Sequence, residues 1–179
     1  MQLFISLDQQ ITKFIINIFP HNPFFDGFFS FFSLIGASIW IWLIIIAIII
    51  FFEEKKDKFF FLYFLISFLA TSLLVNYALK SYFPRQRPYL KYNLEQSSCP
   101  KSSSFPSGHS AVAFASAYLL AVFDKKRGIY YYVFAILVAL SRIYLNCHFF
   151  FDTVGGGIIG MIISFLILKL VVLPNQSKK

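Results

Sequence analysis

The most constraining feature of this chain is a run from Gly27 to Phe52 that contains no charged side chain. A helix needs about 20 apolar residues to cross the hydrocarbon core of a bilayer, so this run is long enough to span it. Four more apolar runs follow along the chain, at residues 59–79, 107–123, 129–145 and 149–173. We therefore predict an all-α integral membrane bundle of about five transmembrane helices.

The composition supports this class. Hydrophobic residues make up 58% of the chain and charged residues only 13%, which leaves too little polar surface to cover the core of an ordinary soluble domain. The formal charge is +8, but the basic residues form short clusters between the apolar runs instead of one patch or helical face. We therefore expect the partner to be the lipid bilayer and exclude nucleic acid.

The N-terminal residues predict a helix of another kind. Between residues 6 and 19, apolar side chains recur at helical spacing opposite polar ones, as in a helix that lies in the membrane interface. Ser6 and Gln9 fit a capping box at its start, and Pro20 and Pro23 follow its end. We expect one domain over residues 1–179: an interfacial helix (1–23), a transmembrane bundle (24–174) and a cytoplasmic tail (175–179).

The basic residues also predict the topology. Nine of the sixteen lysines and arginines lie in the two short turns near residues 55 and 125 and toward the C-terminus, so that side is cytoplasmic by the positive-inside rule. The long polar loop at residues 80–104 then faces outward. Two crossings separate this loop from the stretch at residues 142–152, so both meet on one face whichever way the chain inserts.

His148 and Asp152 are the first candidate catalytic pair. They are four residues apart, so on a helix they would share one face and the carboxylate could reach the ring. Such a carboxylate fixes the imidazole tautomer and leaves the other ring nitrogen free to attack. The alternative is an interior histidine with no catalytic role, although ionisable residues in a membrane segment usually mark a functional site.

A candidate anion site lies on the same face. Lys80, Arg87 and Arg142 supply positive charge, and guanidinium groups match the oxygens of a phosphate in pairs. A helix that begins near Ser107 presents unpaired N–H groups to an anion, while Gly108 permits close approach of the backbone. His109 would then lie beside the phosphate as a general acid. The alternatives are a plain helix start and basic side chains that reach toward lipid headgroups.

Together these residues form a pattern that resembles the three-part signature of the type 2 phosphatidic acid phosphatase superfamily. The three parts are Lys80 with Arg87-Pro88, then Pro106-Ser107-Gly108-His109, then Ser141-Arg142 with His148 and Asp152. The resemblance implies a metal-independent phosphatase without a cofactor, in which His148 forms a phosphohistidine and Asp152 orients it. His109 would act as the general acid, and the phosphate would be held by Lys80, Arg87, Ser107, Gly108 and Arg142. Membrane members commonly have six spans, whereas five and an interfacial helix are expected here.

The resemblance also implies a lipid phosphate substrate, such as undecaprenyl diphosphate, phosphatidylglycerophosphate or the phosphate of lipid A. The first of these is favoured, because so small a chain leaves little polar loop with which to select a headgroup. The expected location is the bacterial inner membrane with the site on its outer face, and no obligatory protein partner is indicated. Two alternatives use the same basic site: a lipid phosphotransferase and a non-catalytic anion or lipid carrier. A disulfide between Cys99 and Cys147 is left open, because the sequence does not supply the geometry.

Overall fold

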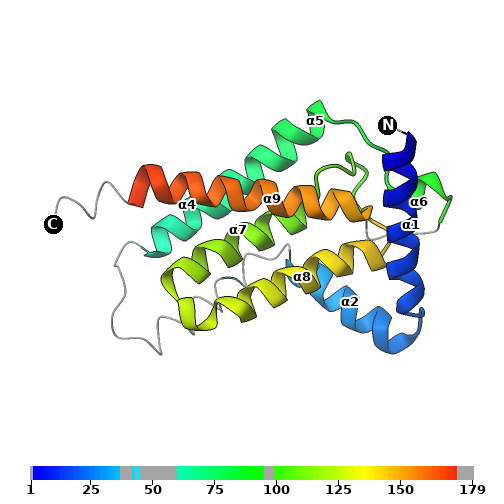
Figure 1. Cartoon of the computed structure of the whole chain (residues 1–179), viewed down its shortest axis with the longest axis horizontal. Helices are drawn as coiled ribbons and strands as arrows, with labels where there is room; N and C mark the ends of the chain where they lie inside the picture. The colour runs from blue at the N-terminus through cyan, green and yellow to red at the C-terminus, as the bar shows by residue number, and fades with distance from the viewer. Residues whose placement is uncertain (1, 37–41, 43, 45–59, 95–98, 173–179) are drawn as a thin grey trace.

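The described part of the chain is a bundle of α-helices with one helix lying across its end (Figure 1). The structure is a computed structural model, and it describes residues 2–36, 42, 44, 60–94 and 99–172. No strand occurs within these ranges, as the sequence predicts. The charged turn at residues 53–58, the tail at 175–179 and most of the first expected span lie outside the described residues.

The N-terminal helix α1 (Gln2–Ile18) crosses the ends of the other helices in Figure 1. It begins four residues before the expected start, so Ser6 lies inside the helix and the expected capping box is wrong. The apolar residues at positions 3–5 continue the same helix, and Ser6 Oγ instead accepts a hydrogen bond from the Gln10 side chain at 3.4 Å. Pro23 opens the next helix, α2 (Pro23–Gly36), where proline suits the first helical turn.

The polar face of α1 points into the protein. Asp8 and Thr12 are buried, whereas Leu3, Phe4 and Phe14 are exposed. A helix with this arrangement can leave its apolar face in lipid while its polar side chains bond to the bundle.

The second expected span forms one continuous helical rod made of α4 (Phe60–Leu73), the π-helix η1 (Leu74–Leu79) and α5 (Lys80–Tyr82). Residues 60–82 are long and apolar enough to cross a bilayer. The polar loop that follows contains the short helix α6 (Pro88–Lys91).

The remaining helices follow the sequence prediction closely. They are α7 (Gly108–Phe123), the 3₁₀ turn η2 (Lys125–Arg127), α8 (Gly128–Tyr144) and α9 (Phe150–Ile167), which continues as the π-helix η3 (Leu168–Val172). Among the described residues, 150–170 form the second helix that is long and apolar enough to span, and α7 is a shorter apolar helix. The count of five spans stays a prediction.

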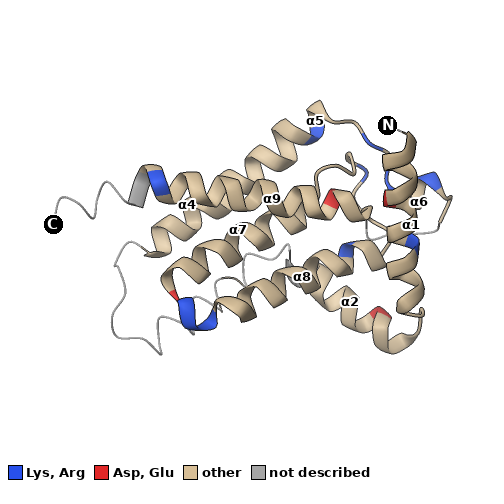
Figure 2. Cartoon of the chain, viewed as in Figure 1, with Lys and Arg blue, Asp and Glu red and all other residues tan. Residues whose placement is uncertain are grey.

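In the described part of the chain, charged side chains collect toward the two ends of the bundle (Figure 2). At one end, the turn at η2 is anchored by Asp124, which is buried and accepts a hydrogen bond from the Tyr131 hydroxyl at 2.7 Å. At the other end, α5, the start of α7, the end of α8 and the start of α9 come together beside α1 and α6 (Figure 1). This second end carries the candidate site.

Candidate active site

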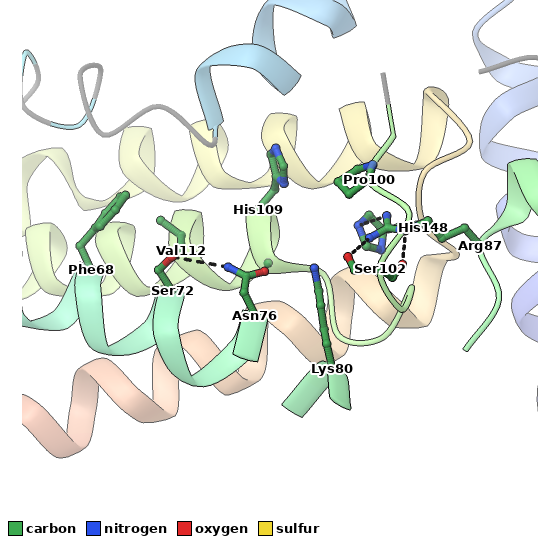
Figure 3. A pocket seen from close by; sticks show the side chains of 11 residues that line it. Phe68, Ser72, Asn76, Lys80, Arg87, Pro100, Ser102, His109, Val112 and His148 are labelled. Carbon is green, nitrogen blue, oxygen red and sulfur yellow. Dashed lines mark hydrogen bonds between the residues drawn. The ribbon is translucent and has the colours of Figure 1, made fainter. Parts of the chain in front are cut away.

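A cavity of about 320 Å³ opens at this end and combines a polar and an apolar part. Five of the predicted site residues line it: Lys80, Arg87, Gly108, His109 and His148. Phe68 and Val112 line its apolar part, farther along α4 and α7 (Figure 3). The cavity can therefore accept a charged headgroup at one end and hydrocarbon at the other.

The rod of α4, η1 and α5 supplies one wall of this cavity. Phe68, Ser72, Asn76 and Lys80 follow one another along it at intervals of four residues (Figure 3). An α-helix has about 3.6 residues per turn, so a stripe at this spacing would rotate away from the cavity. The wider i→i+5 turn of η1 reduces that rotation, and π-helical segments are frequent at functional sites.

The first turn of α7 forms the facing wall. Ser107 is the N-cap residue, and its hydroxyl oxygen accepts hydrogen bonds from the backbone N–H and the hydroxyl of Ser110. A Cβ atom on Gly108 would lie 2.6 Å from Oδ1 of Asn76, so with any larger residue here the Asn76 side chain would have to move. The spacing of the predicted residues gave no indication that Asn76 or Ser72 belongs to the site.

His148 lies in the turn between α8 and α9, and is 1% exposed. The expectation that it shares a helical face with Asp152 is wrong, because α9 begins only at Phe150 after the extended residue Phe149. The pair still meets, since the Asp152 carboxylate folds back over the helix start and accepts the Phe149 N–H at 2.9 Å. Nδ1 of His148 lies 3.8 Å from Oδ2 of Asp152.

Ser104 stands beside this pair. Its hydroxyl donates to Oδ2 of Asp152 at 2.5 Å and lies 3.5 Å from Nδ1 of His148. Ser104 is fully buried, so the hydroxyl, the carboxylate and the ring form one enclosed polar group. Ser104 is a residue that the sequence did not single out, because nothing in its local pattern separates it from the neighbouring serines 102 and 103.

The other ring nitrogen of His148 meets Arg87. Nη1 of Arg87 lies 3.0 Å from Nε2 of His148, and a guanidinium can only donate. Nε2 is therefore the acceptor, which places the ring hydrogen on Nδ1, toward Asp152 and Ser104. Burial lowers the pKa of His148 to about 3, so the imidazole is neutral at physiological pH.

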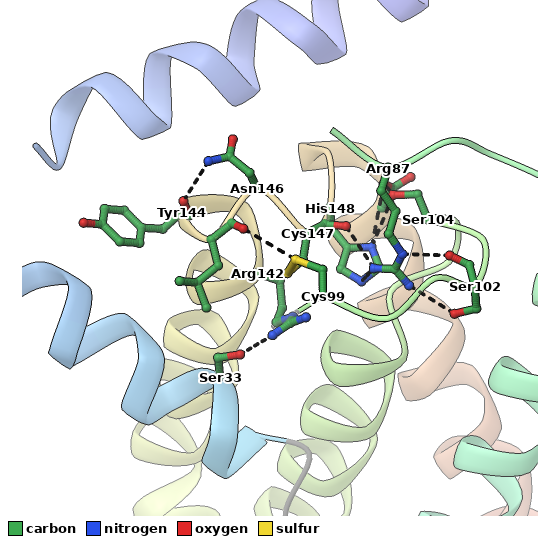
Figure 4. The surroundings of a disulfide bond; sticks show 12 residues. Ser33, Arg87, Cys99, Ser102, Ser104, Arg142, Tyr144, Asn146, Cys147 and His148 are labelled. Carbon is green, nitrogen blue, oxygen red and sulfur yellow. Dashed lines mark hydrogen bonds and ion pairs between the residues drawn. A yellow bond between two sulfur atoms is a disulfide. The ribbon is translucent and has the colours of Figure 1, made fainter. Parts of the chain in front are cut away.

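Arg87 also binds the polar loop. It is 1% exposed and donates to the carbonyl oxygens of Ser102 at 2.7 Å, Ser103 at 3.1 Å and Cys147 at 3.0 Å (Figure 4). These bonds join the loop near residue 102 to the residue before His148. A disulfide between Cys99 and Cys147, with Cα atoms 5.4 Å apart, joins the same two segments. The structure thus forms the bridge that the sequence left open.

Arg142 lies near this disulfide, at the end of α8 (Figure 4). Its side chain is buried, and Nη1 donates to the hydroxyl of Ser33 on α2. Within the described part of the chain, Nε and Nη2 have no hydrogen-bond partner. Buried donors without partners are costly, so this guanidinium is suited to an anion that supplies the missing acceptors.

We compared the chain with protein families and with proteins of known function. The family model of the PAP2 superfamily matches residues 60–175. Phosphatidylglycerophosphatase B of Bacillus subtilis is 31% identical over 173 residues, covering 90% of this chain and 82% of the relative. Undecaprenyl-diphosphatase BcrC of the same organism is 27% identical, covering 91% and 83%.

Solved structures agree with the sequence relatives. The transmembrane PAP2-type phosphatidylglycerolphosphate phosphatase from Bacillus subtilis superposes with a TM-score of 0.73 at 28% identity, covering 100% of this chain and 89% of that one. Aquifex aeolicus LpxE superposes with a TM-score of 0.68 at 28% identity, covering 91% and 95%. The similarity therefore covers the arrangement of the helices as well as the sequence.

Proposed function

Because the chain belongs to the PAP2 superfamily and is thus a phosphatase acting on lipid phosphates, we propose that His148 attacks the phosphate and forms a phosphohistidine. The observation that carries this proposal is the environment of Nε2 of His148. Its lone pair faces Arg87, at the wall of a cavity shared with Lys80 and His109. A neutral imidazole nitrogen beside an anion site is a suitable nucleophile.

In this proposal the phosphate is held by charge and by the start of α7. Lys80 and Arg87 line the cavity, and the unpartnered donors of Arg142 supply further hydrogen bonds. Ser107 and Gly108 open α7, whose first N–H groups favour an anion. The phosphate oxygens would compete with the carbonyl oxygens of Ser102, Ser103 and Cys147 for the N–H donors of Arg87.

The reaction proceeds in two steps. Nε2 of His148 bonds to phosphorus while the bond from phosphorus to the leaving oxygen breaks, and His109 donates its proton to that oxygen. Asp152 and Ser104 stabilise the positive charge on the ring through Nδ1. A water molecule then gives a proton to His109 and bonds to phosphorus, the P–N bond breaks, and inorganic phosphate and neutral His148 result. The balance requires no metal ion and no cofactor.

The substrate in this proposal is a lipid with a phosphate monoester or diphosphate headgroup. The cavity supports this, because its wall continues from Lys80 to the apolar side chain of Phe68. Undecaprenyl diphosphate, phosphatidylglycerophosphate and lipid A phosphate all have this form. We favour undecaprenyl diphosphate, because a chain of 179 residues leaves little polar loop with which to select an elaborate headgroup.

The expected location is the bacterial inner membrane, with the site on the outer face. The Cys99–Cys147 disulfide supports this side, since disulfides persist in oxidising compartments. Labelling with a thiol reagent tests it: the native protein should react only after reduction. Two reactive thiols in protein isolated without reductant would argue for a cytoplasmic site.

The test of the function is phosphate release by detergent-purified protein with EDTA present, across undecaprenyl diphosphate, phosphatidylglycerophosphate, phosphatidic acid and lipid A. We expect one preferred lipid, release without metal, and loss of turnover in His148→Ala. Near-normal rates in His148→Ala would overturn the nucleophile. Product analysis with an acceptor lipid separates the hydrolase from a phosphotransferase, and a folded protein that releases nothing would indicate the non-catalytic carrier.

A further inference from the structure

A single guanidinium joins Asp152 to a second carboxylate. Nη1 of Arg85 lies 2.5 Å from Oδ1 of Asp152, and Nη2 lies 2.5 Å from Oδ2 of Asp8 on α1. Arg85 is held in place further by the ring of Phe149, whose centroid is 4.4 Å from the guanidinium carbon. An ionic connection therefore runs from the N-terminal helix to the carboxylate beside His148.

The carboxylate of Asp152 is bound on both oxygens. Oδ2 accepts from the Ser104 hydroxyl and the Phe149 N–H, and Oδ1 accepts from Arg85. Asp152 is 0% exposed, so these partners define the orientation in which it faces His148. Arg85 is the one charged group among them, and Asp8 in turn fixes Arg85.

Helix α1 also caps the helix that carries Asp152. The first N–H groups of a helix have no partner within it. Here the Phe151 N–H donates to Oδ1 of Asp8 at 2.8 Å, and the Phe150 N–H donates to the Thr12 hydroxyl at 3.0 Å. The start of α9 is thus bonded to α1 as well as to its own residues.

The burial of Asp8 supports a specific role. It is 1% exposed on a helix whose apolar side chains face outward, and a buried carboxylate is unfavourable unless its charge is paired and hydrogen-bonded. Arg85 and the Phe151 N–H supply those partners. Asp8 lies outside the region that matches the family model, which begins at residue 60, so the model gives it no role.

We propose that Asp8 and Arg85 are positioning residues, which hold the Asp152 carboxylate in the orientation that serves His148 and so make α1 part of the active site. The inference rests on the proposed phosphohistidine mechanism. It predicts that the loss of either residue lowers the rate of the chemical step and leaves phosphate binding intact, because neither Asp8 nor Arg85 is among the residues proposed to hold the phosphate.

The experiment compares Asp8→Asn, Arg85→Gln and the double variant with the unchanged protein in detergent. Asparagine keeps an oxygen for the Phe151 N–H, so Asp8→Asn removes the charge and retains the cap. The matched control is Gln10→Ala, an exposed position on the same helix whose side chain donates a hydrogen bond to Ser6. The measurements are kcat, KM, the melting temperature and the single-turnover rate of phosphohistidine formation.

We expect each single variant to lower kcat and the single-turnover rate, on the order of 10²-fold, with KM and melting temperature close to those of the Gln10→Ala control. The double variant should be about as active as the less active of the two single variants, because both residues act through one carboxylate. A fall in melting temperature with unchanged kcat would overturn the proposal, as would losses that multiply in the double variant.

Failure of the inference is distinguishable from failure of the proposed function. If unchanged protein forms no phosphohistidine at residue 148, the mechanism is wrong and this inference falls with it. If unchanged protein forms it and Asp8→Asn forms it at the same rate, only the positioning role is overturned. Should Arg85→Gln fail to fold, Asp8→Asn alone still decides the question.

Discussion

A Cβ atom placed on Gly160 would lie 2.0 Å from the carbonyl oxygen of Ala111. This contact brings α9 against the backbone of α7, and Gly156 makes a similar one at 2.4 Å from the carbonyl oxygen of Ser107. Glycines at positions 155, 156, 157 and 160 give α9 a face of small residues, and such a face permits the close approach of another helix. The close packing of α9, which carries Asp152, against α7, which carries His109, therefore depends on these two glycines.

Gly160→Ala should destabilise the protein strongly. The added methyl group meets backbone, which cannot move aside as a flexible side chain does, and overpacking of this kind costs about 3 kcal/mol or more. Thermal unfolding in detergent measures the effect. Gly27→Ala is the matched control, because no described atom lies within 4 Å of its added Cβ and alanine favours helix. Equal melting temperatures for the two variants would contradict the packing.

Arg87→Lys should lose activity although it keeps the charge. Arg87 donates through three nitrogens to the loop carbonyls and to His148, and an ammonium group has no planar fork with which to replace this set. We expect kcat/KM to fall on the order of 10²-fold, from lost phosphate contacts and a displaced nucleophile. Phosphate release measures it. An unchanged kcat/KM in Arg87→Lys would indicate that a positive charge at this position is enough for activity.

His109→Ala should affect substrates according to their leaving groups. The alkoxide that leaves a lipid phosphate monoester, such as phosphatidylglycerophosphate, needs a proton as it departs, whereas the acidic phenol that leaves an aryl phosphate does not. We expect a loss of about 10²-fold or more for the lipid and a much smaller one for the aryl phosphate. Rates for both substrates in the same preparation give the comparison. An equal loss for both would assign His109 to binding instead of proton transfer.

Local pattern predicted the elements well because each span is a long apolar segment bounded by charge or proline. The predicted start near Ser107 and end at Phe123 match α7, and the basic turn after Asp124 matches η2. Parity of the crossings likewise predicted that the polar stretches share one end. These features are readable because hydrophobicity and helix length are local properties of the chain.

Contacts between segments far apart in the sequence could not be predicted from local pattern. Arg85 pairs with Asp8 across 77 positions and with Asp152 across 67, and no periodicity links such residues. Ser104 likewise lies 48 positions from Asp152. The helical pairing of His148 with Asp152 was wrong for another reason: helix starts are set by capping geometry, and the extended Phe149 moved the start of α9 beyond His148.

Acidification should destabilise the protein through His148. Its pKa is about 3 in the folded state and about 6.5 in an unfolded chain, so between these values the unfolded state binds the additional proton. Stability from this residue is complete above about pH 6.5 and is lost as the pH falls toward 3, on the order of 1 kcal/mol per pH unit. Melting temperatures of the unchanged protein from pH 7 to pH 4 should therefore fall more steeply than those of His148→Asn, which cannot take up that proton. Parallel profiles would mean that the pKa of His148 is not lowered by burial in the folded protein, and this would contradict the enclosed environment of the ring.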